Sequence, residues 1–510
     1  MMKMNKINIQ KLLAAVIVTA VLFTVNYLFK HPINNETRVL YLDDLNFYNE
    51  VCKNTSFFEA IVHKGANKFR PAAYAVLFAA HQIADTNFER LDSLIFIWNL
   101  CIAVGVAGIA FRLIGQKTKL VLRTSLSAFA GVLYSISRFS YYVWTEVFGL
   151  MESMALILAL CILMLLINYI MEKSEHALYI AEILYGMVIF THERYVLLAG
   201  VFVTAVFIKH GLKKMIKFVM PILTAAMFLV IRIAMFGNRF VDGTGGTSII
   251  DTFNSKSMAG SMKSQVQYIL GINAGPAYLN GIGFESVSPV INYCIMLQNI
   301  LILACFYVFI VLVLKKRDFE QIKKSLIYLA FAACCIVSSS ITIRVEMRWV
   351  YVTYAAFVIY LVYMVSYVAA QWKAKGWLLI GFIYLGIGFI YENYYQSYYP
   401  NLYYWGTRSM TGSLYEETLG SYGEDVFDKD FYIVGNSMGW TQDSWDVFFS
   451  QFFKEDRSFP YVTFVDNMDE LLEIIPEKEN SAIVLQENTA ECRYINLTDS
   501  VQRSKVKMES

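Results

Sequence analysis

The chain has 510 residues, is 57% hydrophobic and 16% charged, and carries a formal net charge of +2. A water-soluble fold cannot hide this much apolar surface, so the composition excludes a soluble protein and indicates one built in a bilayer. The basic residues lie in short turns and form no stripe, so we expect no nucleic-acid partner.

Apolar stretches that could cross a membrane recur along residues 1–395. A spanning helix needs roughly 20 mostly apolar residues. Eleven segments come close to this requirement, at 12–29, 93–114, 122–138, 147–170, 179–192, 195–209, 215–236, 289–314, 325–341, 349–370 and 377–393. We therefore predict a polytopic all-α membrane domain of about eleven transmembrane helices.

Lysine and arginine clusters determine the predicted orientation. They occur between alternate spans, at Lys3, Lys6 and Lys11; Arg112, Lys117, Lys119 and Arg123; Lys209, Lys213, Lys214 and Lys217; Lys315, Lys316, Arg317, Lys323 and Lys324; and Lys373 and Lys375. The positive-inside rule makes these segments cytoplasmic, which places the N-terminus inside and the C-terminal region outside. We expect a multi-pass plasma-membrane protein, and the lack of a retention signal in VQRSKVKMES favours a bacterial one.

Two predicted outer loops are long. The first, 30–92, contains Asp43 and Asp44 in YLDDLNFYNE, followed by the amphipathic stretch FRPAAYAVLFAAHQIA. At about 15 residues this stretch is too short to span comfortably and suits a helix lying in the membrane interface. The second loop, 237–288, is rich in Gly, Ser, Thr and Asn, which is typical of a mobile loop.

The C-terminal region, 396–510, has the composition of an ordinary soluble domain. Its predicted strands are DFYIVGN, PYVTFVD and SAIVLQE, and its predicted helices are DSWDVFFSQFFKED and NMDELLEIIPEK. Strands that alternate with helices indicate a mostly parallel sheet. We predict a small extracytoplasmic α/β domain here, attached to the membrane domain of residues 1–395.

Four clusters of charged residues map to the outer ends of the predicted spans. Charge at membrane depth is costly and is usually functional or paired. The clusters are Asp43 and Asp44; Arg70 in KFRPAAY; His192, Glu193 and Arg194 in THERY; and Arg344, Glu346 and Arg348 in ITIRVEMRW. Acids and arginines that converge from distant loops are what an active-site cleft needs.

The residue types suggest a chemistry for such a cleft. A carboxylate can deprotonate a hydroxyl group or bind a divalent cation, and arginine offers a planar fork of donors to phosphate oxygens. We therefore take Asp43 and Asp44 as candidate catalytic residues. The candidate substrate- and phosphate-binding residues are Arg70, Arg194, Arg344, Arg348, Glu346 and His192. Together they suit a displacement in which a hydroxyl group attacks a sugar carbon and a lipid-linked phosphate departs.

With this topology, the acid pair Asp43-Asp44 followed by Phe47 and Tyr48 resembles the Asp-Glu pair of protein mannosyltransferases and aminoarabinose transferases. These belong to the GT-C superfamily of integral membrane glycosyltransferases. The resemblance implies a polyprenyl-phosphate-linked sugar donor, an envelope glycan, lipid or protein acceptor, and Asp43 as the catalytic carboxylate. It leaves Mg²⁺ or Mn²⁺ open as a cofactor, because some members need a metal and others do not.

Each cluster also has a structural interpretation. Asp43 and Asp44 suit a solvated turn or a helix cap, and adjacent residues do not share a face, so one at most points at substrate. Glu346 suits an ion pair with its neighbouring arginines. At the level of function, a transporter or flippase for lipid-linked saccharides, an envelope polysaccharide polymerase and a non-catalytic assembly protein remain open alternatives.

Overall fold

The computed structural model describes most of the chain. The described residues are 6–34, 39–53, 55–65, 68–85, 87–115, 118–172, 174–239, 242, 249, 253–272, 288–342, 345–372, 381, 383, 386–388, 390, 403–453, 459–475 and 482–501. Arg344 and most of the predicted span 377–393 lie outside them.

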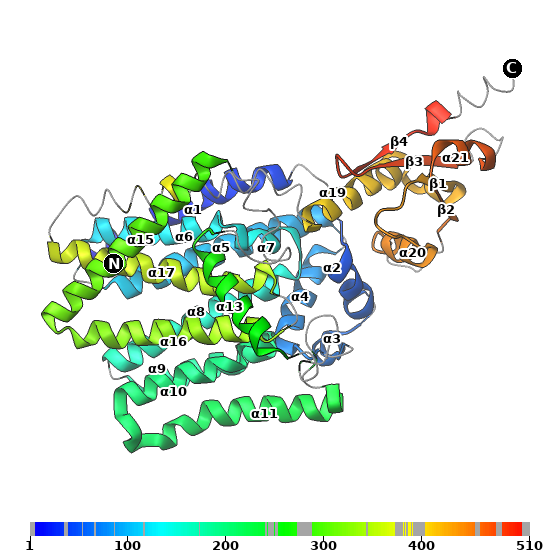
Figure 1. Ribbon diagram of the computed structural model, residues 1–510. Helices are drawn as coiled ribbons and strands as arrows, with labels where there is room; N and C mark the ends of the chain where they lie inside the picture. The colour runs from blue at the N-terminus through cyan, green and yellow to red at the C-terminus, as the bar shows by residue number, and fades with distance from the viewer. Residues whose placement is uncertain are drawn as a thin grey trace.

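A bundle of long helices makes up the membrane domain (Figure 1). Its main helices are α1 (Lys6–Asn34), α5 (Phe88–Ile114), α6 (Leu120–Ser135), α8 (Gly149–Glu172), α9 (Glu175–Thr191), α10 (Ala199–His210), α11 (Val219–Phe236), α15 (Pro289–Lys316), α16 (Phe319–Ser340) and α17 (Met347–Trp372). Seven helices of the described chain are long and apolar enough to cross a membrane, and the protein is a multi-pass membrane protein.

The predicted count of eleven spans is not confirmed. The predicted span 122–138 corresponds to α6, which together with Arg138–Thr145 forms a pair bent by 54° that would make an eighth span. The predicted spans 179–192 and 195–209 correspond to α9, with 17 residues, and α10, with 12. Both are apolar but shorter than the length that a straight crossing needs.

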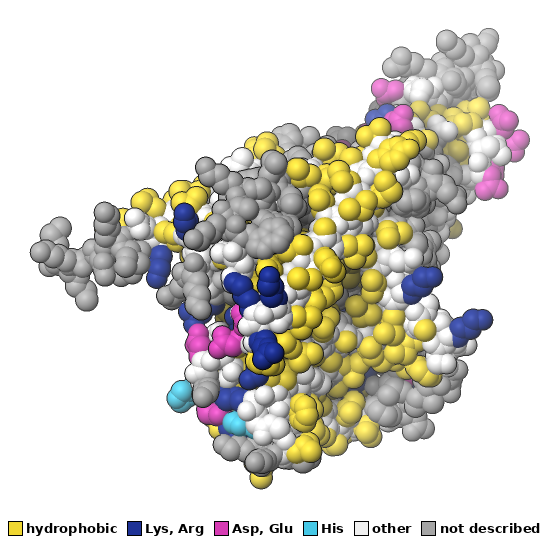
Figure 2. Space-filling model, turned by 60° about the vertical axis from the view of Figure 1, so that its left-hand side comes forward, with side chains coloured by type: hydrophobic (Ala, Val, Ile, Leu, Met, Phe, Trp, Pro, Cys, Tyr) yellow, Lys and Arg dark blue, Asp and Glu magenta, His cyan; other side chains and the backbone are white. Residues whose placement is uncertain are grey.

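Burial differs widely among the spans. The apolar stretch of α17 is 83% buried, whereas that of α11 is only 17% buried. α17 is therefore the centre of the bundle, and α11 turns large apolar side chains such as Ile222, Leu223 and Val230 outward. Figure 2 shows such apolar side chains over the flank of the bundle, as expected of a surface in contact with lipid tails. In that view most Lys and Arg side chains gather at the end away from the C-terminal domain.

Short helices cover one end of the bundle. They are α2 (Leu42–Phe47), the π-helical turn η1 (Tyr48–Cys52), α3 (Phe57–Val62) and α4 (Pro71–Ala84). Pro71 opens α4 because its missing N–H is not needed there, and the helix packs on α5, α8 and α9. The amphipathic helix predicted in the first outer loop is therefore present, with its apolar face packed on the bundle.

The second predicted outer loop is more ordered than its composition indicates. Helix α13 (Ser255–Ile269) lies within it, so the prediction of a mobile loop is wrong for these residues. The Asn254 side chain caps the helix by accepting hydrogen bonds from two backbone N–H groups. Gln265 Nε2 then donates to Ser340 Oγ of α16 over 2.6 Å, which fixes α13 to the bundle.

The C-terminal domain contains a four-stranded sheet in the order β2-β1-β3-β4. The predicted strands are confirmed as β1 (Asp430–Val434), β2 (Val462–Val465) and β3 (Ala482–Asn488), and the predicted helices as α20 (Gln442–Ser450) and α21 (Met468–Ile474). The first three strands are parallel. The short antiparallel edge strand β4 (Arg493–Asn496) was not predicted, because four residues ending in Asn carry little strand signal.

The C-terminal domain packs on the first outer loop. One apolar core contains Leu40, Phe47 and Tyr74 from that loop together with Trp445 and Phe448 from the domain. Figure 1 shows the domain at the end of the bundle where α2 and α4 lie, joined to it through α19 (Tyr403–Tyr415). This end of the molecule also contains the candidate site.

Candidate active site

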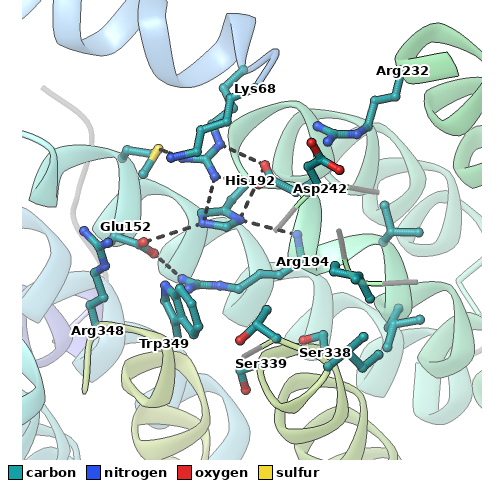
Figure 3. Close-up of a pocket in the computed structure, with 18 of the residues that line it drawn as sticks. Lys68, Glu152, His192, Arg194, Arg232, Asp242, Ser338, Ser339, Arg348 and Trp349 are labelled. Carbon is teal, nitrogen blue, oxygen red and sulfur yellow. Dashed lines mark hydrogen bonds and ion pairs between the residues drawn. The ribbon is translucent and has the colours of Figure 1, made fainter. Parts of the chain in front are cut away.

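A cavity of about 420 Å³ lies among the helix ends near the first outer loop (Figure 3). Its titratable lining residues are Asp43, Lys68, Arg70, Glu152, His192, Glu193, Arg194, Arg232, Asp242 and Arg348. Glu152 is the fourth residue of α8 and Arg348 the second of α17, so the cavity opens at one membrane surface and not at the centre of the bundle. Five of the lining side chains are Lys or Arg and four are Asp or Glu.

The two adjacent acids of the first outer loop have different environments. Asp43 is exposed and lines the cavity. Asp44 is 2% exposed, and its two oxygens accept hydrogen bonds from the backbone N–H groups of Val147, at 2.5 Å, and Phe148, at 2.8 Å. Asp44 therefore holds the turn that precedes α8, while Asp43 has its carboxylate available to a substrate.

Arg70 makes a bidentate ion pair across the cavity wall. It is the N-cap residue of α4, and its Nε and Nη2 atoms donate to the two carboxylate oxygens of Glu193 over 2.8 and 2.6 Å. Arg70 Nη2 also lies 3.3 Å from His192 Nε2. Bidentate pairing fixes the plane of the guanidinium group. The predicted cavity arginine is therefore held rigidly by an acid of the THERY segment.

Arg194 makes a second ion pair beside the first. The 3-10 turn η3 (Glu193–Leu198) carries Arg194, whose Nη2 donates to the Glu152 carboxylate of α8. Glu152 is 1% exposed, and its other oxygen lies 3.8 Å from His192 Nε2. The Nη1 group of Arg194 has no hydrogen-bond partner among the described residues, so the side chain retains a buried donor at the cavity.

Burial and these charges set the protonation states of the THERY segment. Burial, reinforced by the Arg70 guanidinium, holds the pKa of His192 well below its usual value, so the imidazole is neutral at neutral pH. Burial alone would raise the pKa of Glu193, but the charge and hydrogen bonds of Arg70 outweigh it and hold that pKa well below the usual range. Glu193 is therefore a carboxylate at neutral pH.

The RVEMRW segment contributes two described cavity residues, Arg348 and Trp349. Arg348 lines the cavity, and its Nε lies 2.6 Å from Glu346 Oε2, so the ion pair predicted as a structural alternative is present. Its guanidinium carbon lies 4.5 Å from the centre of the Tyr142 ring, within cation–π distance. Glu346 is 4% exposed and does not line the cavity. Arg344 lies outside the described residues.

Four titratable cavity residues lie outside the predicted clusters, namely Lys68, Glu152, Arg232 and Asp242. Lys68 precedes α4 and is half-buried, and no ion pair holds its ammonium group among the described residues. Arg232 from α11 and Asp242 lie beside each other on the same side of the cavity in Figure 3. Lys68 stands two residues before Arg70 in KFRPAAY, so the same motif could have indicated it. Asp242 lies in the Gly-rich loop, where the sequence carries no such signal.

The described residues include no group of three or more His, Cys, Asp or Glu side chains placed to hold a metal ion. The acids of the cavity are instead paired with arginines. Mg²⁺ and Mn²⁺ prefer several oxygen ligands at once, and here Asp43 is the acid whose oxygens face the cavity without a described ion pair.

No protein-family model and no curated protein matches the sequence. Among solved structures, ArnT from Cupriavidus metallidurans in the apo state is similar with 10% identity and a TM-score of 0.47, over 93% of each chain. The structure of ArnT from the same organism bound to undecaprenyl phosphate has 11% identity and a TM-score of 0.49, also over 93% of each chain.

Proposed function

We propose that the protein is a membrane glycosyltransferase that moves a sugar from a polyprenyl-phosphate carrier to a cell-envelope polymer or lipid at the outer membrane face. The observation that carries this proposal is the position of Asp43. Its exposed carboxylate shares one cavity with Lys68 and several arginines, at the membrane surface where a lipid-linked phosphate would lie.

The charge of the cavity suits a phosphodiester donor. Its lining has one more cationic than acidic side chain, and His192 is neutral, so a donor with a single negative charge would balance it. Lys68 offers an ammonium group without a described ion pair, and Arg194 offers a buried N–H donor. We assign these two residues to the donor phosphate, with Arg70 and Arg348 as further contacts.

The reaction follows from these positions. The acceptor hydroxyl oxygen attacks the anomeric carbon of the sugar and loses its proton to the Asp43 carboxylate. The bond between that carbon and the phosphate oxygen breaks, and the electron pair stays on the departing polyprenyl phosphate. Lys68 and the arginines stabilise the negative charge that grows on this phosphate.

The position of the charges argues against a transporter. A transporter of lipid-linked saccharides places its polar binding groups near the bilayer midplane, often at broken helices. Glu152 and Arg348 instead lie in the first turns of their helices. A polysaccharide polymerase would use the same chemistry with a larger donor, so the size of the accepted donor separates it from the proposed enzyme.

The test is transfer of label from a panel of undecaprenyl-phosphate sugars by the purified protein. We expect Asp43→Asn to lower turnover by about 10²–10⁴-fold, the usual contribution of a general base. Glu50→Gln is the matched control, because Glu50 is an exposed acid of the same loop that does not line the cavity. Full turnover by Asp43→Asn would refute the assigned base.

Silence of the wild-type protein across the panel would refute the proposed enzyme class for these donors. Binding of a lipid-linked oligosaccharide would then be measured in the same preparation. Tight binding without transfer would favour the transporter, and joining of oligosaccharides would favour the polymerase.

A further inference from the structure

The side-chain amide of Gln451 makes two hydrogen bonds to the backbone of the first outer loop. Gln451 follows α20 in the C-terminal domain and is fully buried. Its Oε1 accepts from the Leu40 N–H over 2.6 Å, and its Nε2 donates to the Leu40 carbonyl over 3.1 Å. The amide thus satisfies both polar groups of one buried peptide residue, as a neighbouring strand would.

A second contact joins α20 to the other end of the same segment. Ser450 Oγ donates to Asn49 Oδ1 over 3.0 Å, and Asn49 lies in η1, directly after α2. The C-terminal domain therefore holds residues on both sides of Asp43, three residues before it and six residues after it.

Between these contacts the backbone adopts an unfavourable conformation. Leu42, the residue before Asp43, has φ +49°, in the left-handed region that leucine rarely occupies. Such a residue persists only where the surrounding structure fixes it. On one side the fixed neighbour is Leu40, bound to Gln451. On the other side it is Asp44, bound to the N–H groups of Val147 and Phe148.

We propose that the C-terminal domain positions the catalytic loop, and that Gln451 is the positioning residue through which it acts. Gln451 keeps Leu40 in place, and the chain turns at Leu42 through its positive φ. This turn directs the Asp43 carboxylate at the cavity. This role rests on the proposed function for its effect on catalysis. It gives the domain a part in the reaction without any contact to substrate.

The competing explanation is that apolar packing alone holds the loop, since Leu40 and Phe448 belong to one core. The two explanations differ in what Gln451→Ala does. With packing alone, the loop keeps its position. With the amide as positioning group, its loss leaves the N–H and carbonyl of Leu40 buried without partners, and the segment opens to reach water.

The test compares Gln451→Ala with Gln442→Ala in the full-length protein. Gln442 is the matched control, because it also uses both ends of its amide, but within the domain: Oε1 accepts from the Val462 N–H over 2.9 Å and Nε2 donates to Asp446 over 2.7 Å. The first measurement is hydrogen–deuterium exchange of residues 39–48, which needs no substrate. The second is kcat and donor KM with the undecaprenyl-phosphate sugar that the wild-type protein accepts.

We expect Gln451→Ala to speed exchange in 39–48 and to lower kcat by about 10- to 100-fold, as small misplacements of reacting groups do, with donor KM unchanged. Gln442→Ala should change neither. Adding Leu42→Gly to Gln451→Ala should restore part of kcat, because glycine adopts a positive φ without help from its neighbours. If Gln451→Ala does not fold, Gln451→Asn takes the place of that variant in both measurements. Asn keeps the amide group on a side chain that is one methylene shorter.

Unchanged exchange in 39–48 would overturn the proposal, and so would faster exchange with unchanged kcat. A wild-type protein that transfers no sugar would refute the proposed function. The exchange measurement would still decide whether Gln451 holds the loop.

Discussion

Helix α9 has an ion-pair network at each of its ends, and the two networks differ in burial. At its N-terminus Glu175 pairs with Lys209, at 3.3 Å, and with Lys217. There the Glu175 side chain is 39% exposed. At its C-terminus the chain continues into the THERY segment, where Arg194 pairs with Glu152 and their side chains are 8% and 1% exposed.

The difference shows which charges suit binding. Water screens exposed ion pairs, so each of them contributes little to the free energy of unfolding. Buried pairs cannot be hydrated, so each charge depends on its partner and keeps a fixed direction. The cavity lies against the buried network, where a phosphate can meet oriented donors that have already been stripped of water. Ion pairs alone therefore do not mark a site, but buried ion pairs around a cavity do.

The largest contrast between the two networks should appear when one acid is neutralised. Glu152→Gln leaves Arg194 buried beside an uncharged group, and we expect a loss of about 3–5 kcal/mol in the free energy of unfolding. Glu175→Gln should cost at most about 1 kcal/mol. The measurement is reversible unfolding of both variants in mixed micelles. Equal losses would show that burial does not separate the two networks.

The sequence predicted the parts of the molecule whose signals are local. Short apolar runs indicated β1, β2 and β3, and charge at helix ends indicated Arg70, Arg194 and Arg348. These signals need only a few neighbouring residues. The shape of the site depends on residues far apart in the chain, and no single segment reports it.

Pairing partners are the clearest example. Glu152 and Arg194 are 42 residues apart, and nothing in either segment says that they meet. The different environments of Asp43 and Asp44 arise from the backbone N–H groups of Val147 and Phe148, about a hundred residues further along the chain. Adjacent acids look alike in a sequence, and only the fold shows that one is buried as an anchor.

A second contrast between the two ends of α9 should appear on acidification. Burial and Arg70 lower the pKa of His192. Below about pH 6.5 the unfolded chain therefore binds a proton at this residue that the folded protein does not bind. The free energy of unfolding therefore keeps its full value above about pH 6.5. It decreases as the pH falls below that value, by about 1.4 kcal/mol per pH unit for each such histidine. His81 in α4 behaves alike, because burial lowers its pKa to about 4.

The measurement is the free energy of unfolding between pH 7 and pH 5. His192→Gln should reduce the slope of the free energy of unfolding against pH by the contribution of one histidine. His176→Gln at the other end of α9 is the control, because its side chain is exposed. An unchanged slope in His192→Gln would show that His192 gains its proton in the folded state as readily as in the unfolded one.

The smallest effect is expected at Glu146, the buried acid in the turn that Asp44 holds. It is 1% exposed, and burial, together with the negative charge of Asp44, raises its pKa well above the usual range. Burial thus favours the neutral acid at Glu146, whereas Glu152 is paired with Arg194. Glu146→Gln preserves both shape and charge, so we expect sugar transfer to be retained and the free energy of unfolding to change by less than about 1 kcal/mol. A loss as large as that of Glu152→Gln would mean that Glu146 is ionised and belongs to the charged network.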